Sequence, residues 1–301
     1  MLSSLREAAA RADSAFIALA LLAYAVSVVI VALRWRVVLS GVTRKQAPLG
    51  PLVLATLASG FVNNVTPAGR LSGEACRVVA LVRLRLASKS RAAAVIAYER
   101  FSEAPAILGL AIATLLVVGR FPRARALQTP SLLMSVLAAV AAVGCIVAVL
   151  MRVPQLAHPL RRLRDRWRTL GSIAIRPSAL ATSAILSAVI WSLDVVRVRL
   201  VAAAFHAPIG LTETATLTAI TIVAGFVPTI GGLGAVEGGL IAGMIGLGIA
   251  PADAVAITAV ERGISYGLAT LLGAGSLSLL GGRSLWNAVR FRAPAAEGAA
   301  T

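Results

Sequence analysis

Two pairs of adjacent acidic and basic residues lie within apolar stretches of this sequence. Glu99 is followed directly by Arg100, and Glu261 is followed directly by Arg262. Neighbouring residues of a helix point about 100° apart, so the two members of each pair cannot bond well to one another. Each arginine is therefore free to bond another helix or a ligand. A guanidinium suits a phosphate group, because the two can form parallel hydrogen bonds.

A single glutamate precedes each pair at nearly the same distance along the chain. The interval from Glu74 to Glu99 differs by one position from the interval from Glu237 to Glu261. The stretches around these single glutamates are also alike, since each begins with Gly-Phe-Val and continues through a proline to a glycine. Several features in the same order at nearly equal spacing indicate an internal repeat.

The segments that must position these residues are apolar helices. The chain is 58% hydrophobic and 14% charged, whereas soluble domains carry about 25% charged residues. The runs 14–33, 126–151 and 263–282 contain no charge, and about 20 apolar residues in a helix cross a bilayer. The sequence therefore predicts an all-α polytopic integral membrane protein. Apolar segments lie at about 14–33, 50–66, 72–86, 92–119, 126–151, 177–204, 212–230, 233–249 and 252–282.

Two regions, 50–86 and 212–249, carry too many glycines, prolines and charges to be ordinary spans. Charges at the bilayer centre are costly, so we expect re-entrant or broken helical hairpins that line protein or water. Glycines in such hairpins let backbone N–H groups approach a phosphate. The expected hairpin backbone positions are Asn63, Asn64, Pro67, Gly73, Pro228, Gly231, Gly232 and Gly234.

The order of the segments predicts one membrane domain, 1–301, with a first repeat at 14–119, a connecting span at 126–151 and a second repeat at 177–282. Three crossings separate the two hairpins, so the repeats should have inverted topology. The distribution of basic residues also favours inversion. The segment 70–91 contains six Lys and Arg, whereas the segment 200–261 contains none. Inverted repeats with interrupted helices are typical of transporters, whose substrates bind at the repeat interface.

The net charge of +17 indicates short basic loops and contacts with anionic lipids rather than nucleic acid binding. The arginine-rich loop 152–168 and the C-terminal arginines predict a cytoplasmic C-terminus in the cell membrane. Cys76 and Cys145 suggest no disulfide framework. We expect no metal site, no cofactor and no catalytic motif.

Charges inside the membrane are the candidates for function, because each must be paired or used. We expect Glu74 and Glu237 to lie close to Arg262 or Arg100 of the opposite repeat. These contacts could also be buried salt bridges that only hold the halves together. In the functional interpretation, the arginines of the two Glu-Arg pairs contact an anionic headgroup and the glutamates hold them in place. The expected substrate-binding residues are Arg70, Glu74, Arg77, Glu99, Arg100, Glu237, Glu261 and Arg262. Asp194 and Arg197, one helical turn apart, should neutralise each other.

Three of these motifs, in this order, resemble a known family. The stretch 60–77, the pair Glu99-Arg100 and the stretch 228–238 are similar to signatures of the lysylphosphatidylglycerol synthase transmembrane family, also called flippase-like. In its best-known member this membrane domain is joined to a synthase that aminoacylates phosphatidylglycerol. Only a short tail follows Gly282 here, so we expect no such soluble domain and no enzyme activity. The resemblance implies movement of a modified or isoprenoid lipid between leaflets.

We therefore expect a lipid translocase that moves an anionic, modified or isoprenoid lipid. The residues leave two other interpretations open. One is a membrane scaffold or accessory subunit that partners a lipid or cell-envelope enzyme. The other is an ion-coupled carrier of a small polar solute, which inverted repeats with buried carboxylates would also serve.

Overall fold

The computed structural model describes residues 12–66, 70–118, 173–225 and 230–281, and every regular element within them is helical. The connecting span 126–151, the loop 152–168, the C-terminal arginines, Pro67 and Pro228 lie outside the described residues. The elements of the first part are α2 (Ser14–Thr43), α3 (Leu49–Val65), α4 (Arg70–Arg83) and α5 (Lys89–Val118). Those of the second part are α8 (Pro177–Ala204), α9 (Leu211–Ala224), η2 (Ile230–Gly232), α10 (Ala235–Gly246), α11 (Pro251–Arg262), η3 (Gly263–Leu268) and α12 (Ala269–Leu279).

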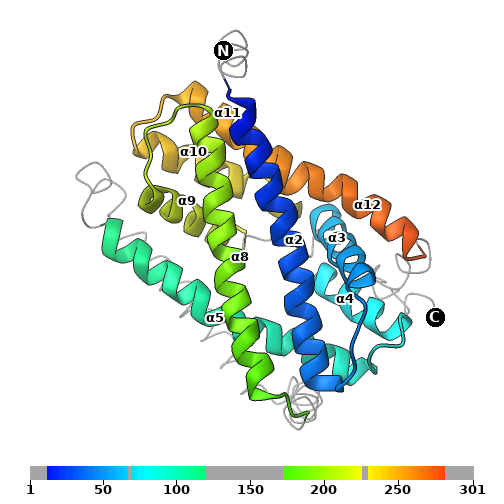
Figure 1. Ribbon diagram of the computed structural model, residues 1–301. Helices are drawn as coiled ribbons and strands as arrows, with labels where there is room; N and C mark the ends of the chain where they lie inside the picture. The colour runs from blue at the N-terminus through cyan, green and yellow to red at the C-terminus, as the bar shows by residue number, and fades with distance from the viewer. Residues whose placement is uncertain (1–11, 67–69, 119–172, 226–229, 282–301) are drawn as a thin grey trace, which may run out of the picture.

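Two long apolar helices, α2 and α8, lie side by side through the centre of the molecule and run in opposite directions (Figure 1). At one end the backbone N–H of Asp13 donates to the carbonyl of Ala204 at 2.9 Å. At the other end Gly41 of α2 lies against Ala179 of α8, so closely that a Cβ at Gly41 would clash with it. The helix pair α3–α4 lies on one side of this central pair, and α9–α10 lies on the other.

Apolar packing shows which chain segments meet at each end of the central pair. At the end where α2 finishes, Val42 packs in one cluster with Leu49 at the start of α3 and with Leu86 after α4. At the opposite end, Ala20 packs with Ile209 before α9 and Ile249 after α10. Each helical pair therefore begins and ends at the same end of the molecule, and the two pairs start from opposite ends.

Three helices among the described residues are long and apolar enough to cross a membrane: α2, α8 and the continuous stretch Pro251–Leu279. The shorter apolar helices α3 and α10 could not cross it alone, because about 20 residues are needed. The expected segment 177–204 coincides with α8, and α3 and α4 begin and end close to their expected bounds. The first segment continues to Thr43 instead of ending at Leu33, so Arg34 and Arg36 lie inside α2.

Each Glu-Arg pair is followed by a feature that alters the regular α-helical hydrogen bonding. Pro105 lies inside α5, where it cannot donate a backbone hydrogen bond. The corresponding part of the second half is the π-helix η3, which directly follows Arg262. Wide π turns of this kind often occur at functional sites.

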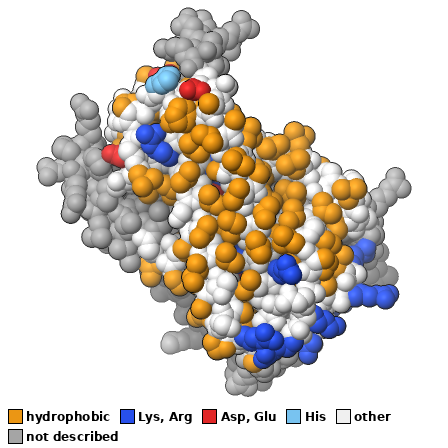
Figure 2. Space-filling view, viewed as in Figure 1, with side chains coloured by type: hydrophobic (Ala, Val, Ile, Leu, Met, Phe, Trp, Pro, Cys, Tyr) orange, Lys and Arg blue, Asp and Glu red, His pale blue; other side chains and the backbone are white. Residues whose placement is uncertain are grey.

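The visible face of the molecule is largely apolar over α2, α8 and α12, while Lys and Arg gather mainly at the end where α2 finishes (Figure 2). Side chains such as Leu22, Ile185 and Leu271 are exposed on these helices. An apolar exterior of this extent suits contact with lipid, since soluble proteins rarely expose large continuous apolar patches.

Candidate functional site

A network of buried charges lies where α2, α4 and α5 meet. Glu99 is completely buried and contacts two arginines, Arg34 Nε at 3.3 Å and Arg77 Nη2 at 2.9 Å. Arg34 also donates to the Ser187 hydroxyl of α8 at 3.0 Å. The Arg77 guanidinium stacks over the Trp35 ring at 4.3 Å. Glu99 is therefore held by helices before it in the chain, and its charge is fully offset.

Arg100 lies beside this network but faces outward. Its Nε is 2.9 Å from Glu74 Oε1 on α4, and its Nη1 pairs with Glu103 one turn further along α5. Glu103 also lies 3.8 Å from Arg34, which joins the two groups. The Arg100 side chain remains 39% exposed. Because a guanidinium has five N–H groups and only two are engaged here, Arg100 keeps donors for a ligand.

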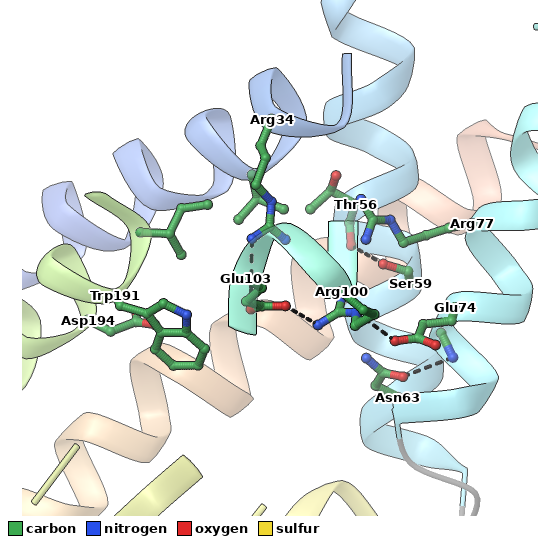
Figure 3. A pocket seen from close by; sticks show the side chains of 13 residues that line it. Arg34, Thr56, Ser59, Asn63, Glu74, Arg77, Arg100, Glu103, Trp191 and Asp194 are labelled. Carbon is green, nitrogen blue, oxygen red and sulfur yellow. Dashed lines mark hydrogen bonds and ion pairs between the residues drawn. The ribbon is translucent and has the colours of Figure 1, made fainter. Parts of the chain in front are cut away.

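A pocket of about 240 Å³ opens next to Arg100 (Figure 3). It is bounded by residues from α2, α3, α4, α5 and α8, so both halves of the described chain contribute. Nine of its thirteen lining residues are polar or charged. The thirteen residues are Val31, Arg34, Thr56, Ser59, Asn63, Gly73, Glu74, Arg77, Arg100, Glu103, Ile190, Trp191 and Asp194. A pocket of this volume has room for several waters or a small polar headgroup.

The hairpin α3–α4 is closed by close backbone contact at the pocket wall. The backbone N–H of Gly73 donates to Asn63 Oδ1 at 2.9 Å. A Cβ at Gly73 would overlap the Asn63 amide and the carbonyl of Ser59, so only glycine fits there. This contact aligns the start of α4, and with it Glu74, against the end of α3.

The tip of α3 also contacts the second half. The Asn64 side chain donates to the Thr270 hydroxyl at 2.8 Å, and the Tyr266 hydroxyl donates to the Asn64 carbonyl at 3.0 Å. Gly231, at φ 59°, packs against Tyr266 and the Asn64 backbone, where a Cβ would clash. Gly231 therefore needs to be glycine for both conformation and space.

Glu237 and Arg262 form the second ion pair near this tip. Arg262 Nε lies 2.6 Å from Glu237 Oε1, and Glu237 also accepts from the Gly234 N–H at 2.6 Å. Arg262 donates to the Gly231 carbonyl at 3.3 Å and stacks on the Tyr266 ring at 4.8 Å. The Arg262 side chain is 17% exposed and does not line the pocket. Arg262 therefore joins the end of α11 to η2 and to the start of α10.

A third group joins α8 to α11. Arg197 contacts Asp194 on its own helix and Glu261 Oε1 at 2.9 Å. Glu261 also accepts from the Ser265 hydroxyl at 3.1 Å. The expected pairing of Asp194 with Arg197 is confirmed, and Glu261 shares the same guanidinium.

Two expectations about partners are wrong. Glu74 and Glu237 pair with Arg100 and Arg262 of their own half, not with the arginine of the opposite repeat. The α4 and α10 helices each pack beside the Glu-Arg helix that follows them, which brings these groups together.

The second error is the expectation that Glu99 and Glu261 hold Arg100 and Arg262 in place. Neither contacts the arginine that follows it. Glu99 instead offsets Arg34 and Arg77, and Glu261 offsets Arg197. The reason is the turn of about 100° between neighbours, which aims each glutamate at the central helices and each arginine away from them.

The pocket brings together some of the predicted site residues and leaves others apart. Glu74, Arg77 and Arg100 line it with Asn63 and Gly73. Beneath the lining lies Glu99, in contact with Arg77. The remaining predicted residues do not line the pocket. They are Asn64, Gly231, Gly232, Gly234, Glu237, Glu261 and Arg262. Arg70 is the first residue of α4, and its side chain lies outside the described part of the structure.

Sequence reasoning missed Arg34, Thr56, Ser59 and Trp191, which all line the pocket. A signal for Arg34 exists in the spacing. The interval from Arg34 to Arg197 equals the interval from Glu74 to Glu237, which we call the repeat offset. The interval from Glu99 to Glu261 is shorter than the repeat offset by one position. Arg34 and Arg197 thus hold the equivalent glutamates of the two halves.

The fold and the buried charge networks define a polytopic helical membrane protein with an internal polar pocket. The family model described as the lysylphosphatidylglycerol synthase TM region matches residues 1–273, so the chain belongs to that family. A UPF0104 membrane protein of Methanothermobacter thermautotrophicus is 26% identical, over 92% of this chain and 89% of the relative. A UPF0104 membrane protein of Pyrococcus horikoshii is 24% identical, over 87% of this chain and 86% of the relative.

Proposed function

We propose that the protein is a lipid translocase that moves an anionic, modified or isoprenoid lipid between leaflets, with the headgroup bound at Arg100. The observation that carries this proposal is the partly exposed Arg100 guanidinium in a polar pocket inside an apolar helical protein. A phosphate would take the donors that Glu74 and Glu103 leave free, so binding need not break either ion pair.

The surface beside Arg100 supports entry from the membrane. Phe101, the next residue of α5, is 67% exposed, and Leu108, two turns further along the same face, is 61% exposed. An apolar face next to a polar pocket suits an amphipathic ligand. The acyl chains could stay against α5 while the headgroup enters the pocket, whose volume of about 240 Å³ is too small for both.

The two halves are proposed to be inverted-topology repeats whose helical pairs α3–α4 and α9–α10 are re-entrant. The repeat offset, which relates Arg34 to Arg197 and Glu74 to Glu237, supports the repeat. The packing of the two pairs at opposite ends of α2 and α8 supports the inversion. Domain bounds of 14–119 and 177–282, joined by a span at 126–151, follow from this proposal.

The same proposal orients the protein in the cell membrane. Basic residues lie near the end where α2 finishes, among them Arg44, Lys45, Arg83, Arg85, Lys89 and Arg176. Leu280, after α12, packs at this same end. By the positive-inside rule this end is cytoplasmic, and the chain leaves α12 on the cytoplasmic side.

A carrier of a small polar solute is the second candidate, and the size of the pocket favours it. The pocket of about 240 Å³ offers space on the scale of a small polar molecule such as glycerol phosphate. Such a solute could bind Arg100 without acyl chains, so the test must include it.

The test is leaflet exchange in vesicles that contain the purified protein. A panel of fluorescent lipids with anionic, zwitterionic and neutral headgroups is exposed to an impermeant quencher, and empty vesicles serve as the control. The proposal predicts quenching of inner-leaflet anionic lipid only with protein. Uptake of labelled glycerol phosphate without any lipid exchange would instead favour the solute carrier. Absence of both activities would contradict transport.

A further inference from the structure

The charges of the ion-pair network in the first half balance, and those of the ion-pair group around α8 do not. Among the described residues, the network near the pocket joins three arginines with three glutamates. They are Arg34, Arg77, Arg100, Glu74, Glu99 and Glu103. The pair Glu237–Arg262 balances as well. The group on α8 has one guanidinium, Arg197, in contact with two carboxylates, Asp194 and Glu261.

The extra carboxylate has no counterpart in the first half. At the repeat offset that relates Arg34 to Arg197, the position equivalent to Asp194 is Val31. Both side chains line the pocket. Asp194 is therefore an addition of the second half to a shared arrangement, and it is the member that adds an uncompensated negative charge beside the headgroup pocket.

No other cation near Asp194 is available to offset it within the described residues. Besides Arg197 and Glu261, the groups that face it are Glu103 of α5 and Tyr24 of α2. Of these only Arg197 is positive. The arginines that share the pocket lining are engaged by Glu99, Glu74 and Glu103. The α9 helix brings one charged side chain, Glu213, in its first turn.

Two carboxylates on one guanidinium in a poorly solvated site have a simple way to reach neutrality. A proton on either carboxylate would achieve it, because two like charges that are close together and partly buried are costly to keep ionised. Asp194 is the member in contact with the pocket, and its side chain is 22% exposed, which provides a path to water.

We propose that the Asp194–Arg197–Glu261 triad binds one exchangeable proton, and that this proton enters and leaves through the pocket together with the anionic headgroup. This inference rests on the proposed function of the pocket. The proton forms an O–H bond on a carboxylate of the triad and comes from water in the pocket. A bound anion adds negative charge close to Asp194, which favours the protonated triad. Anion and proton therefore bind cooperatively.

The proton can be observed without any lipid. Infrared spectra of the purified protein near pH 6 should contain the C=O stretch of a protonated carboxyl group, and this band should weaken as the pH is raised to about 8, a range in which ordinary exposed carboxylates stay ionised. Asp194→Asn should remove this band, because Glu261 then has Arg197 to itself. Glu261→Gln should remove it for the converse reason, and it serves as the second variant if the first folds poorly. Asp253→Asn, in the first turn of α11, is the control and should keep the band. A band that persists in both triad variants, or that is absent from the wild type, overturns the proton site.

The coupling is tested by binding of short-chain phosphatidylglycerol, whose phosphodiester keeps one charge over the range used. Between about pH 6 and 8, ordinary exposed carboxylates stay ionised. If the bound state holds one more proton, wild-type affinity should fall by up to about tenfold for each pH unit of increase. Asp194→Asn should bind with an affinity that does not change with pH.

Each outcome of the binding experiment decides something. A pH-independent wild type, or the same pH dependence in Asp194→Asn, overturns the coupling. No binding by the wild type at any pH overturns both the coupling and the headgroup site at Arg100. The infrared band is still decisive for the proton in that case, so failure of the triad and failure of the proposed function are distinguishable.

Discussion

Replacing Glu99 should damage the protein far more than replacing its counterpart Glu261. Glu99→Gln leaves Arg34 and Arg77 buried without the carboxylate between them. Glu261→Gln leaves Arg197 with Asp194, which neutralises it alone. The two substitutions are chemically identical and lie at equivalent positions of the two halves, so each is a control for the other.

The expected difference follows from burial and charge. Removing one partner of a buried ion pair costs about 3–5 kcal/mol, because an uncompensated charge stays buried. Glu99→Gln should destabilise the protein by about this amount, since Glu99 has no exposed surface. Glu261→Gln should cost about 1 kcal/mol, the scale of one rearranged hydrogen bond. The double variant Asp194→Asn with Glu261→Gln removes both partners of Arg197 and should again cost about 3–5 kcal/mol.

Thermal unfolding of the purified variants in one detergent measures these differences. One kcal/mol shifts the midpoint of large domains by about 2–4 °C, so Glu99→Gln should melt about 6–20 °C below the wild type. Glu261→Gln should melt within about 4 °C of it by the same conversion. If Glu261→Gln proved as unstable as Glu99→Gln, the count of charges around Arg197 would be wrong.

Three further predictions concern the hairpins. In a protein without its native cysteines, Ser88→Cys and Ala250→Cys should be labelled to different extents by an impermeant reagent in intact cells, because the repeats are proposed to be inverted. Equal labelling of the two positions would contradict the inversion. Gly73→Ala should lower the free energy of unfolding by about 1–3 kcal/mol in denaturant titrations, because the new Cβ overlaps Asn63. An unchanged denaturation midpoint would mean that α3 and α4 can move apart without cost. Asn64→Ala should increase amide hydrogen exchange at the start of α12, because the hydrogen bond from Asn64 to Thr270 is lost. Unchanged exchange would show that this hydrogen bond does not stabilise the start of α12.

Much of the fold follows from hydrophobic patterning alone. The apolar segments predict helices, and α8 coincides with the expected segment 177–204. The glycine and proline content correctly indicated that 50–86 and 212–249 are each broken into two helices. Helix formation and interruption of this kind depend on local sequence, which a single chain displays directly.

The partners of the charged residues could not be predicted in the same way. Glu74 could have reached either Arg100 or Arg262, and only the packing of α4 against α5 decides for Arg100. The role of Arg34 could not be predicted for a different reason. This arginine follows a long uncharged run and resembles a residue flanking a span, whereas α2 continues beyond it to Thr43. Its role becomes visible only when the repeat offset is applied from Arg197.

The most direct test of the account is leaflet exchange of fluorescent phosphatidylglycerol by Arg100→Lys, compared with Arg36→Lys on the same scale of folded protein in the vesicles. Lysine keeps the charge at position 100 but loses the planar fork of donors. If Arg100 binds the headgroup, exchange should be largely lost in Arg100→Lys. Exchange should stay at the wild-type level in Arg36→Lys, because the Arg36 guanidinium contacts Gln46 away from the pocket. Full exchange per folded molecule in Arg100→Lys would show that Arg100 is a structural charge and that the headgroup binds elsewhere.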